Sequence, residues 1–123
     1  MAIVITGNKL SIDHIVNVSR NNKPVSLDTS SIDKILKCRE LVEDKIDAGE
    51  IMYGINTGIG EFSETILNPD QIKDFQKYLI YNHSAGIGDP SPKEHVRAAM
   101  LSRINVHSKG MSGCRLIIVK TLL

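Results

Sequence analysis

The chain has 123 residues, of which 41% are hydrophobic, 24% are charged and 4% are aromatic, and its formal net charge is +1. This balance is typical of a globular chain long enough to bury a core, and it gives no electrostatic reason to expect nucleic acid or an anionic membrane as a partner. No apolar run approaches membrane-spanning length, and the first residues lack the basic segment of a signal peptide. The two cysteines form no C-x-x-C pair, which favours free thiols in a reducing cytoplasm.

A small β element is predicted near the N-terminus. Residues 2–6 and 24–27 are short segments bounded by turn residues, so we expect two brief strands that pair with each other. Between them, Ser11 is a candidate N-cap, and apolar residues recur at helical spacing from Ile12 to Val16. The pattern therefore predicts a strand, a short helix and a second strand.

A long helix is predicted over residues 30–48. Ser30 and Asp33 have the spacing of a capping box at its start. The apolar residues that follow fall largely on one stripe: Ile32, Ile35, Leu36, Val42 and Ile46. Gly49 comes directly after this pattern and is the expected C-terminal stop.

The most unusual stretch is Tyr-Gly-Ile-Asn-Thr-Gly-Ile-Gly at residues 53–60, and the loop that it opens continues to about Leu67. Its glycines make a poor helix and a poor strand, so we interpret it as a shaped loop that presents Tyr53 and Asn56. A flexible connector with one surface tyrosine explains the composition equally well. The order G-x-x-x-G-x-G, followed by Glu61, matches neither the dinucleotide fingerprint nor the P-loop, which argues against nucleotide binding.

The next predicted helix carries a histidine on its apolar face. Asn68 is a favoured N-cap, with proline at the first helical position and glutamine at the third. Four residues then share one face by their spacing: Ile72, Phe75, Leu79 and His83. His83 is either a satisfied core residue or a functional group, and spacing alone favours the core residue.

Two more helices complete the chain. Pro92 and Glu94 mark the start of one, which ends at residues 109–110. Its predicted apolar stripe contains Val96, Ala99, Met100 and Ile104. Ser112 is expected to cap the last helix, which is still apolar at Leu123, so we expect the native chain to continue. No His, Cys or carboxylate group has metal-ligand spacing, so no metal site is predicted.

Four segments taken together resemble the aromatic amino-acid ammonia-lyases, and among these the histidine ammonia-lyases. They are residues 53–60, 82–88, 96–103 and 109–115, of which the last reads Lys-Gly-Met-Ser-Gly-Cys-Arg. The resemblance spans about residues 50–123 in the right order, with a weaker match over residues 27–49. Ile59 departs from the family pattern, which usually has phenylalanine at this place.

The resemblance implies a mainly α-helical chain with the ammonia-lyase (aspartase/fumarase-like) fold. It implies that residues 1–123 are a single N-terminal domain of a longer lyase and that residues 53–67 are a mobile, glycine-rich active-site loop. Enzymes of this family are homotetramers whose active sites draw on several subunits. Their electrophile is methylidene-imidazolone, which forms from an internal Ala-Ser-Gly and needs no metal. That tripeptide lies beyond this chain, so we expect residues 1–123 alone to be inactive.

The resemblance also gives three residues a role. Tyr53 matches the tyrosine that removes the β-proton of the substrate, Gly60 matches a glycine that lines the substrate site, and His83 matches the residue that contacts the substrate's ring. The β-proton of an amino acid is weakly acidic, so the base must be strong, and an ionised phenol meets this need. A glycine-rich loop also allows the base to close over the substrate and exclude water.

The resemblance leaves the substrate open. Histidine, converted to urocanate and ammonia, is the first hypothesis, and a tyrosine ammonia-lyase or an aminomutase is the second. His83 cannot separate them, because an imidazole forms a hydrogen bond with an imidazole or with a phenol equally well. The third hypothesis is a short non-catalytic assembly module. Two stretches, residues 84–86 and 111–113, are similar in composition to Ala-Ser-Gly but are not expected to form the electrophile.

Overall fold

The computed structural model describes all residues 1–123, and the chain folds into two compact units. One unit contains residues 1–43 and 90–123, and the other contains residues 44–89. The chain is mainly helical, as predicted, and none of its helices has the length and apolar content that crossing a membrane requires. That residues 1–123 form a single domain stays a prediction, because a domain is defined by folding on its own and not by contacts alone.

The β element near the N-terminus is a parallel pair of strands, β1 (Ile3–Ile5) and β2 (Val25–Leu27). Ile3 lies opposite Val25, and its amide donates a hydrogen bond of 2.8 Å to the carbonyl of Pro24. The predicted pairing of these two segments is therefore confirmed. Both ends of β1 are buried while its middle residue is exposed, which is the alternation expected of a strand with one covered face.

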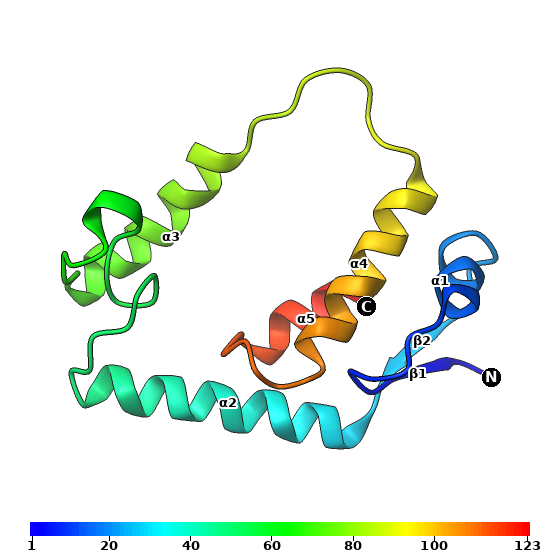
Figure 1. Cartoon of the computed structure of the whole chain (residues 1–123), viewed down its shortest axis with the longest axis horizontal. Coiled ribbons are helices and arrows are strands. Elements are labelled where there is room, and N and C mark those ends of the chain that lie inside the picture. The colour runs from blue at the N-terminus through cyan, green and yellow to red at the C-terminus, as the bar shows by residue number, and fades with distance from the viewer. The chain divides into compact units, whose positions relative to one another are not determined.

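The crossover that parallel strands require is supplied by α1 (Ile12–Ser19). Ser11 caps this helix as predicted, because its hydroxyl accepts a hydrogen bond of 3.2 Å from the amide of His14. α1 packs against α4 (Lys93–His107), the first helix of the chain's C-terminal segment. Figure 1 shows this pair beside the two strands.

The core of this unit is formed by buried apolar side chains from each of its own helices and from β1. The two remaining helices that contribute are α2 (Thr29–Asp47), whose first part belongs here, and α5 (Leu116–Leu122). The buried residues are Ile3, Ile5, Val18, Ile35, Leu101, Ile104 and Val119. Residues far apart in the sequence therefore meet in one small core.

The apolar stripe predicted for α4 is partly wrong. Ile104 is buried as expected, but Val96 is 46% exposed, and Leu101 is buried in its place. α4 carries apolar residues on more than one side, so spacing alone does not choose its inner face. The packing of α4 against α1 and α5 makes that choice.

Two predicted helix caps are also wrong. α2 begins at Thr29, one residue before the expected cap Ser30, because the Asp28 carboxylate accepts hydrogen bonds from the hydroxyl and the amide of Ser30. These bonds, the hydroxyl's above all, hold the pKa of Asp28 below its usual value. At the other end of the chain, α5 has Arg115 as its N-cap with no side-chain hydrogen bond. Ser112 instead contacts His107 at the end of α4.

The unit of residues 44–89 contains the loop, one turn of 3₁₀-helix, η1 (Gly60–Phe62), and α3 (Pro69–His83). Gly49 ends α2 as predicted, and its amide donates a hydrogen bond of 3.0 Å to the carbonyl of Ile46. Asn68 and Gln71 cap each other's backbone at the start of α3, which confirms the predicted capping box. No large apolar side chain of this unit is fully buried.

We predict that Gly110→Ala destabilises the chain far more than Gly49→Ala. Both glycines have positive φ, where an L-residue costs about 1–2 kcal/mol. A Cβ at Gly110 would also lie 2.4 Å from the Cβ of Lys34 and 2.7 Å from its carbonyl carbon, whereas a Cβ at Gly49 would meet nothing within 4 Å. Displacing the backbone of α2 adds about 1–3 kcal/mol. Urea unfolding followed by circular dichroism measures both variants, and equal losses of stability would contradict this reading.

Candidate active site

The loop of residues 53–67 is built on the buried side chain of Asn56. Its amide oxygen accepts a hydrogen bond of 2.8 Å from the backbone N–H of Met52, and its amide nitrogen donates one of 2.7 Å to the carbonyl of Glu50. The backbone carbonyl of Asn56 accepts a third bond, of 3.0 Å, from the N–H of Leu67. The sequence-based expectation that the loop presents Asn56 is therefore wrong. The residue is 7% exposed and holds the two ends of the loop together.

Thr57 and Gly58 stabilise the turn inside the loop, Thr57 through hydrogen bonds and Gly58 through its small size. The fully buried Thr57 hydroxyl accepts from the N–H of Gly54 at 3.1 Å and donates to the carbonyl of Gly58 at 2.9 Å. Thr57 also forms an isolated antiparallel bridge with Ile66. Gly58 is required for its size, because a Cβ there would lie 2.6 Å from the Cβ of Phe62. Sequence reasoning missed both roles, and the Asn-Thr-Gly triplet was the only local signal of a polar turn.

Tyr53 and Gly60, both predicted from the resemblance to be site residues, are in contact within this loop. The phenol of Tyr53 is 65% exposed, and its oxygen accepts a hydrogen bond of 3.3 Å from the N–H of Gly60. The bond fixes the direction in which the phenol points. A Cβ at Gly60 would meet nothing within 4 Å, so the space beside the phenol is open. The arrangement offers an accessible proton acceptor next to free space.

His83 is the last residue of α3 and is exposed. The three apolar residues predicted to share its face are partly buried: Ile72, Phe75 and Leu79. His83 is therefore not a satisfied core residue of this chain. Its Nδ1 lies 2.9 Å from the carbonyl of Leu79, and a carbonyl only accepts, so Nδ1 donates. In the neutral imidazole, Nε2 is then an unprotonated acceptor that faces solvent.

The structure thus joins Tyr53 to Gly60 but shows no hydrogen bond between His83 and the loop. All three residues belong to the same compact unit, residues 44–89. No group of three or more His, Cys, Asp or Glu side chains is close enough to hold a metal ion. Within this chain, the chemistry available at the loop is proton transfer by the phenol.

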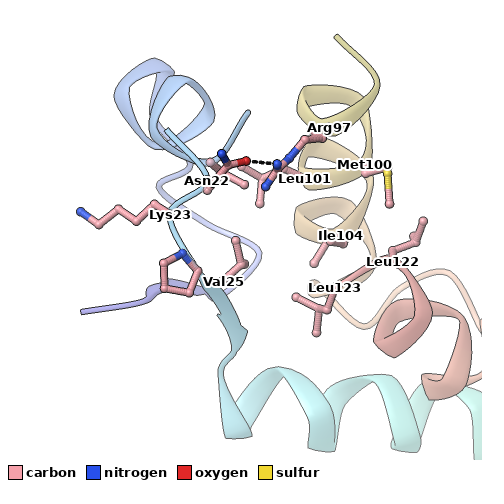
Figure 2. A pocket seen from close by; sticks show the side chains of 11 residues that line it. Asn22, Lys23, Val25, Arg97, Met100, Leu101, Ile104, Leu122 and Leu123 are labelled. Atoms are coloured by element: carbon pink, nitrogen blue, oxygen red, sulfur yellow. Dashed lines mark hydrogen bonds between the residues drawn. The ribbon is translucent and has the colours of Figure 1, made fainter. Parts of the chain in front are cut away.

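The other unit contains a pocket of about 310 Å³ between α1, β2, α4 and α5 (Figure 2). Its floor is apolar and includes Leu101 and Ile104. The Arg97 guanidinium lies at its polar side and donates a hydrogen bond to the side-chain oxygen of Asn22, whereas the amine of Lys23 points away from α4 (Figure 2). The lining contains no carboxylate, histidine, cysteine or hydroxyl side chain, and none of the predicted site residues. It is therefore a weaker candidate for catalysis than the loop.

Comparison with known proteins agrees with the resemblance. Residues 10–123 match the model of the aromatic amino acid lyase family. A curated relative, the histidine ammonia-lyase of Caldanaerobacter subterraneus subsp. tengcongensis, is 42% identical over 121 residues, which are 98% of this chain and 24% of the relative. This chain therefore spans about a quarter of the length of such relatives.

Solved structures show the same fold. They include ergothionase of Treponema denticola, an ergothioneine-degrading enzyme (TM-score 0.94, 26% identity, 99% of this chain and 24% of that one). Tyrosine aminomutase of Streptomyces globisporus has a TM-score of 0.92 and 29% identity over 99% of this chain and 23% of its own. Histidine ammonia-lyase of Trypanosoma cruzi has a TM-score of 0.90 and 31% identity over 100% of this chain and 24% of its own. The predicted fold class, a mainly α chain of the ammonia-lyase fold with a small β element, is confirmed.

We predict that Asn56→Ala opens the loop locally. The substitution leaves the N–H of Met52 and the carbonyl of Glu50 without their partner, which costs about 1–3 kcal/mol. Amide hydrogen exchange within residues 52–67 should therefore accelerate by about tenfold or more. Asn82→Ala is the control, because Asn82 is exposed and its side chain makes no hydrogen bond. Unchanged exchange in the Asn56 variant would show that the clamp does not hold the loop. The mobility predicted for residues 53–67 is read from the same experiment on the unsubstituted chain.

Proposed function

Because the chain belongs to the aromatic amino acid lyase family, we propose that it is the N-terminal part of a histidine ammonia-lyase. The complete enzyme eliminates ammonia from L-histidine and releases urocanate. The observation that carries this proposal is the exposed phenol of Tyr53, whose oxygen accepts a hydrogen bond from the N–H of Gly60. The loop that contains Tyr53 is held by its own hydrogen bonds, such as the one from the N–H of Met52 to the side chain of Asn56. The identity to curated histidine ammonia-lyases favours histidine over other amino acids as the substrate.

The electrophile of the reaction is proposed to come from residues outside this chain. Methylidene-imidazolone forms from Ala-Ser-Gly, and neither similar tripeptide here fits that precursor. Ser84-Ala85-Gly86 has alanine in the middle, which has no hydroxyl to lose as water. In Met111-Ser112-Gly113, the Ser112 hydroxyl is engaged with His107 at 2.9 Å. When present, the electrophile would activate the amino group as a leaving group.

The part of this chain in the reaction is to remove a proton. In our proposal the ionised phenol of Tyr53 takes the proton from the β-carbon of the substrate. The electron pair of that C–H bond becomes the double bond between the α- and β-carbons, and the amino group leaves from the α-carbon. The Gly60 N–H keeps the phenol oxygen directed during this transfer. Gly60 itself leaves room for the substrate, since no side chain occupies the space beside it.

His83 is proposed to recognise the ring of the substrate. Its Nδ1 is occupied by the carbonyl of Leu79, so the free Nε2 accepts from a donor on the ring. The imidazole N–H of histidine and the phenol O–H of tyrosine both satisfy this requirement. A phenylalanine ring has no donor and does not.

Tyrosine is the second candidate substrate, in a tyrosine ammonia-lyase or an aminomutase. It is favoured by the structural likeness to a tyrosine aminomutase over nearly the whole chain.

The complete protein is proposed to be a cytoplasmic homotetramer. Several large apolar side chains of the 44–89 unit are exposed, which supports the proposal that the surface of this unit packs against other segments or subunits in the complete protein. They are Tyr78, Ile80, Tyr81 and Ile87.

We expect Tyr53→Phe in the complete enzyme to reduce kcat by about 10²–10⁴-fold, because the variant keeps the ring and loses the proton acceptor. Tyr81→Phe is the control for loss of a phenol hydroxyl elsewhere in the same unit, since Tyr81 lies on α3 and the variant keeps its ring and the ring's apolar contacts. Urocanate absorbance gives the rate, and circular dichroism verifies the fold. Near-normal turnover by the Tyr53 variant would refute its role as the base.

The His83→Leu variant is expected to lose activity in a substrate-dependent manner. A hydrogen bond lost at Nε2 is worth roughly 1 kcal/mol, and more where the ring donor stays buried without a partner. kcat/KM for histidine and for tyrosine should therefore fall about fivefold or more, while kcat/KM for phenylalanine changes little. Equal losses for the three amino acids would mean that His83 only supports the structure.

Residues 1–123 by themselves should release no urocanate from histidine, because they contain no Ala-Ser-Gly. The mass of the purified chain should equal that of its sequence, without the loss of two waters that formation of the electrophile entails. A mass lower by two waters, or measurable turnover, would overturn the proposal that the electrophile lies outside this chain.

A further inference from the structure

Three chemically active side chains meet at the end of α4, in the unit that does not contain the loop. His107 is the last residue of α4, and Ser112 and Cys114 follow in the connection to α5. His107 Nδ1 lies 2.9 Å from the Ser112 hydroxyl and 3.6 Å from the Cys114 sulfur. The Ser112 hydroxyl lies 3.3 Å from that sulfur. An imidazole, a hydroxyl and a thiol thus form a closed triangle.

The path of this connection is fixed by α2. Gly110 approaches the backbone of Lys34 so closely that no side chain fits between them. The guanidinium of Arg39 donates a hydrogen bond of 3.2 Å to the carbonyl of Gly113, and a Cβ at Gly113 would lie 2.8 Å from the side chain of Val42. The segment that carries Ser112 and Cys114 is therefore held at two points, and the triangle does not depend on a freely moving loop.

The triangle is suited to activating a thiol. Burial first, and then the positive charge of Arg103, lower the pKa of His107, which leaves the imidazole free to accept a proton but weakens it as a base. A neutral imidazole whose Nδ1 is unprotonated accepts the proton of the thiol. The thiolate that results accepts from the protonated Nδ1 and from the Ser112 hydroxyl. Cys114 is partly exposed, with one side packed against the apolar core, and the neighbouring Ser112 is exposed.

We propose that Cys114, assisted by His107 and Ser112, is a thiol–disulfide exchange site for low-molecular-weight disulfides. The thiol proton moves from sulfur to His107 Nδ1, and the Cys114 sulfur attacks one sulfur of the disulfide. A new disulfide bond forms between Cys114 and that half of the reagent. The bond within the reagent breaks, and its other half leaves as a thiolate that takes the proton from Nδ1. Cys114 is oxidised, the departing half is reduced, and no further oxidant is needed. The site is independent of the proposed lyase function.

Cys38 provides an internal reference. It is also a free, partly exposed cysteine of the same unit, on α2, and its thiol makes no hydrogen bond. The variant Cys38→Ser leaves Cys114 as the only thiol, and Cys114→Ser leaves Cys38. Reaction of each variant with the aromatic disulfide dithiobis(nitrobenzoate) at pH 7 gives a second-order rate constant from the absorbance of the released thiolate. Cys114 should react at least about tenfold faster than Cys38, and the two rates should converge in denaturing urea.

Substitution of the partners tests the mechanism. In the Cys38→Ser background, His107→Gln should slow Cys114 by about tenfold, and Ser112→Ala by a smaller factor. In the Cys114→Ser background, His107→Gln should leave the rate of Cys38 unchanged. Incubation with glutathione disulfide should add one glutathionyl group to Cys114, identified by the mass of the peptide that contains it.

Equal rates for the two thiols in the folded chain would overturn the proposal. So would an unchanged rate of Cys114 in a His107→Gln variant that keeps its helical circular dichroism. Where that variant does not fold, Ser112→Ala decides, because the exposed hydroxyl caps no helix and its removal disturbs nothing but the triangle. An unchanged rate in that variant would equally refute the assisted thiol.

Discussion

The unit of residues 1–43 and 90–123 depends on one constraint, which is that its apolar core must be assembled from both ends of the chain. Ile35 of α2, Leu101 of α4 and Val119 of α5 are almost completely buried together. Burying a side chain of this size stabilises the fold by about 1.5–3 kcal/mol. Closing the chain across residues 44–89 opposes this by about 3 kcal/mol, a cost that grows only with the logarithm of the loop's length. Burial of two or three such side chains offsets the cost of loop closure, so the core can form although residues 44–89 separate its two sequence segments.

The unit of residues 44–89 is stabilised differently, because its buried side chains are polar. Asn56 and Thr57 are covered, while the exposed aromatic residues Tyr53, Tyr78 and Tyr81 belong to the same unit. Hydrogen bonds between side chains and nearby backbone hold the loop, and these need no apolar partner from elsewhere. The frame of the candidate active site is therefore local. The phenol that it presents remains accessible.

Local chemistry was predictable from the sequence, and choices made by tertiary packing were not. Asn68, Pro69 and Gln71 identify a helix start by hydrogen bonds that a few neighbouring residues form among themselves, and the structure contains them. Val96 and Leu101 could each have faced the core, because α4 is apolar on several sides, and only its neighbours decide between them. The prediction that the loop presents Asn56 was wrong for the same reason. The side chain of a small polar residue in a loop can form hydrogen bonds with the backbone or with a ligand, and its position in the sequence does not distinguish the two. The contact of Tyr53 with Gly60 depends on the path of the whole turn, which no pattern of residue types encodes.

The two glycines that flank the turn of the loop differ in what they allow a protein engineer to change. Gly58 is fixed, because any side chain there would collide with Phe62 and unmake the turn. Gly60 has positive φ and open surroundings, and asparagine and aspartate adopt that backbone conformation more readily than other residues do. A library aimed at altered substrate preference would therefore hold position 58 constant and begin with asparagine at position 60. There a new side chain would stand beside the phenol without rebuilding the loop that carries it.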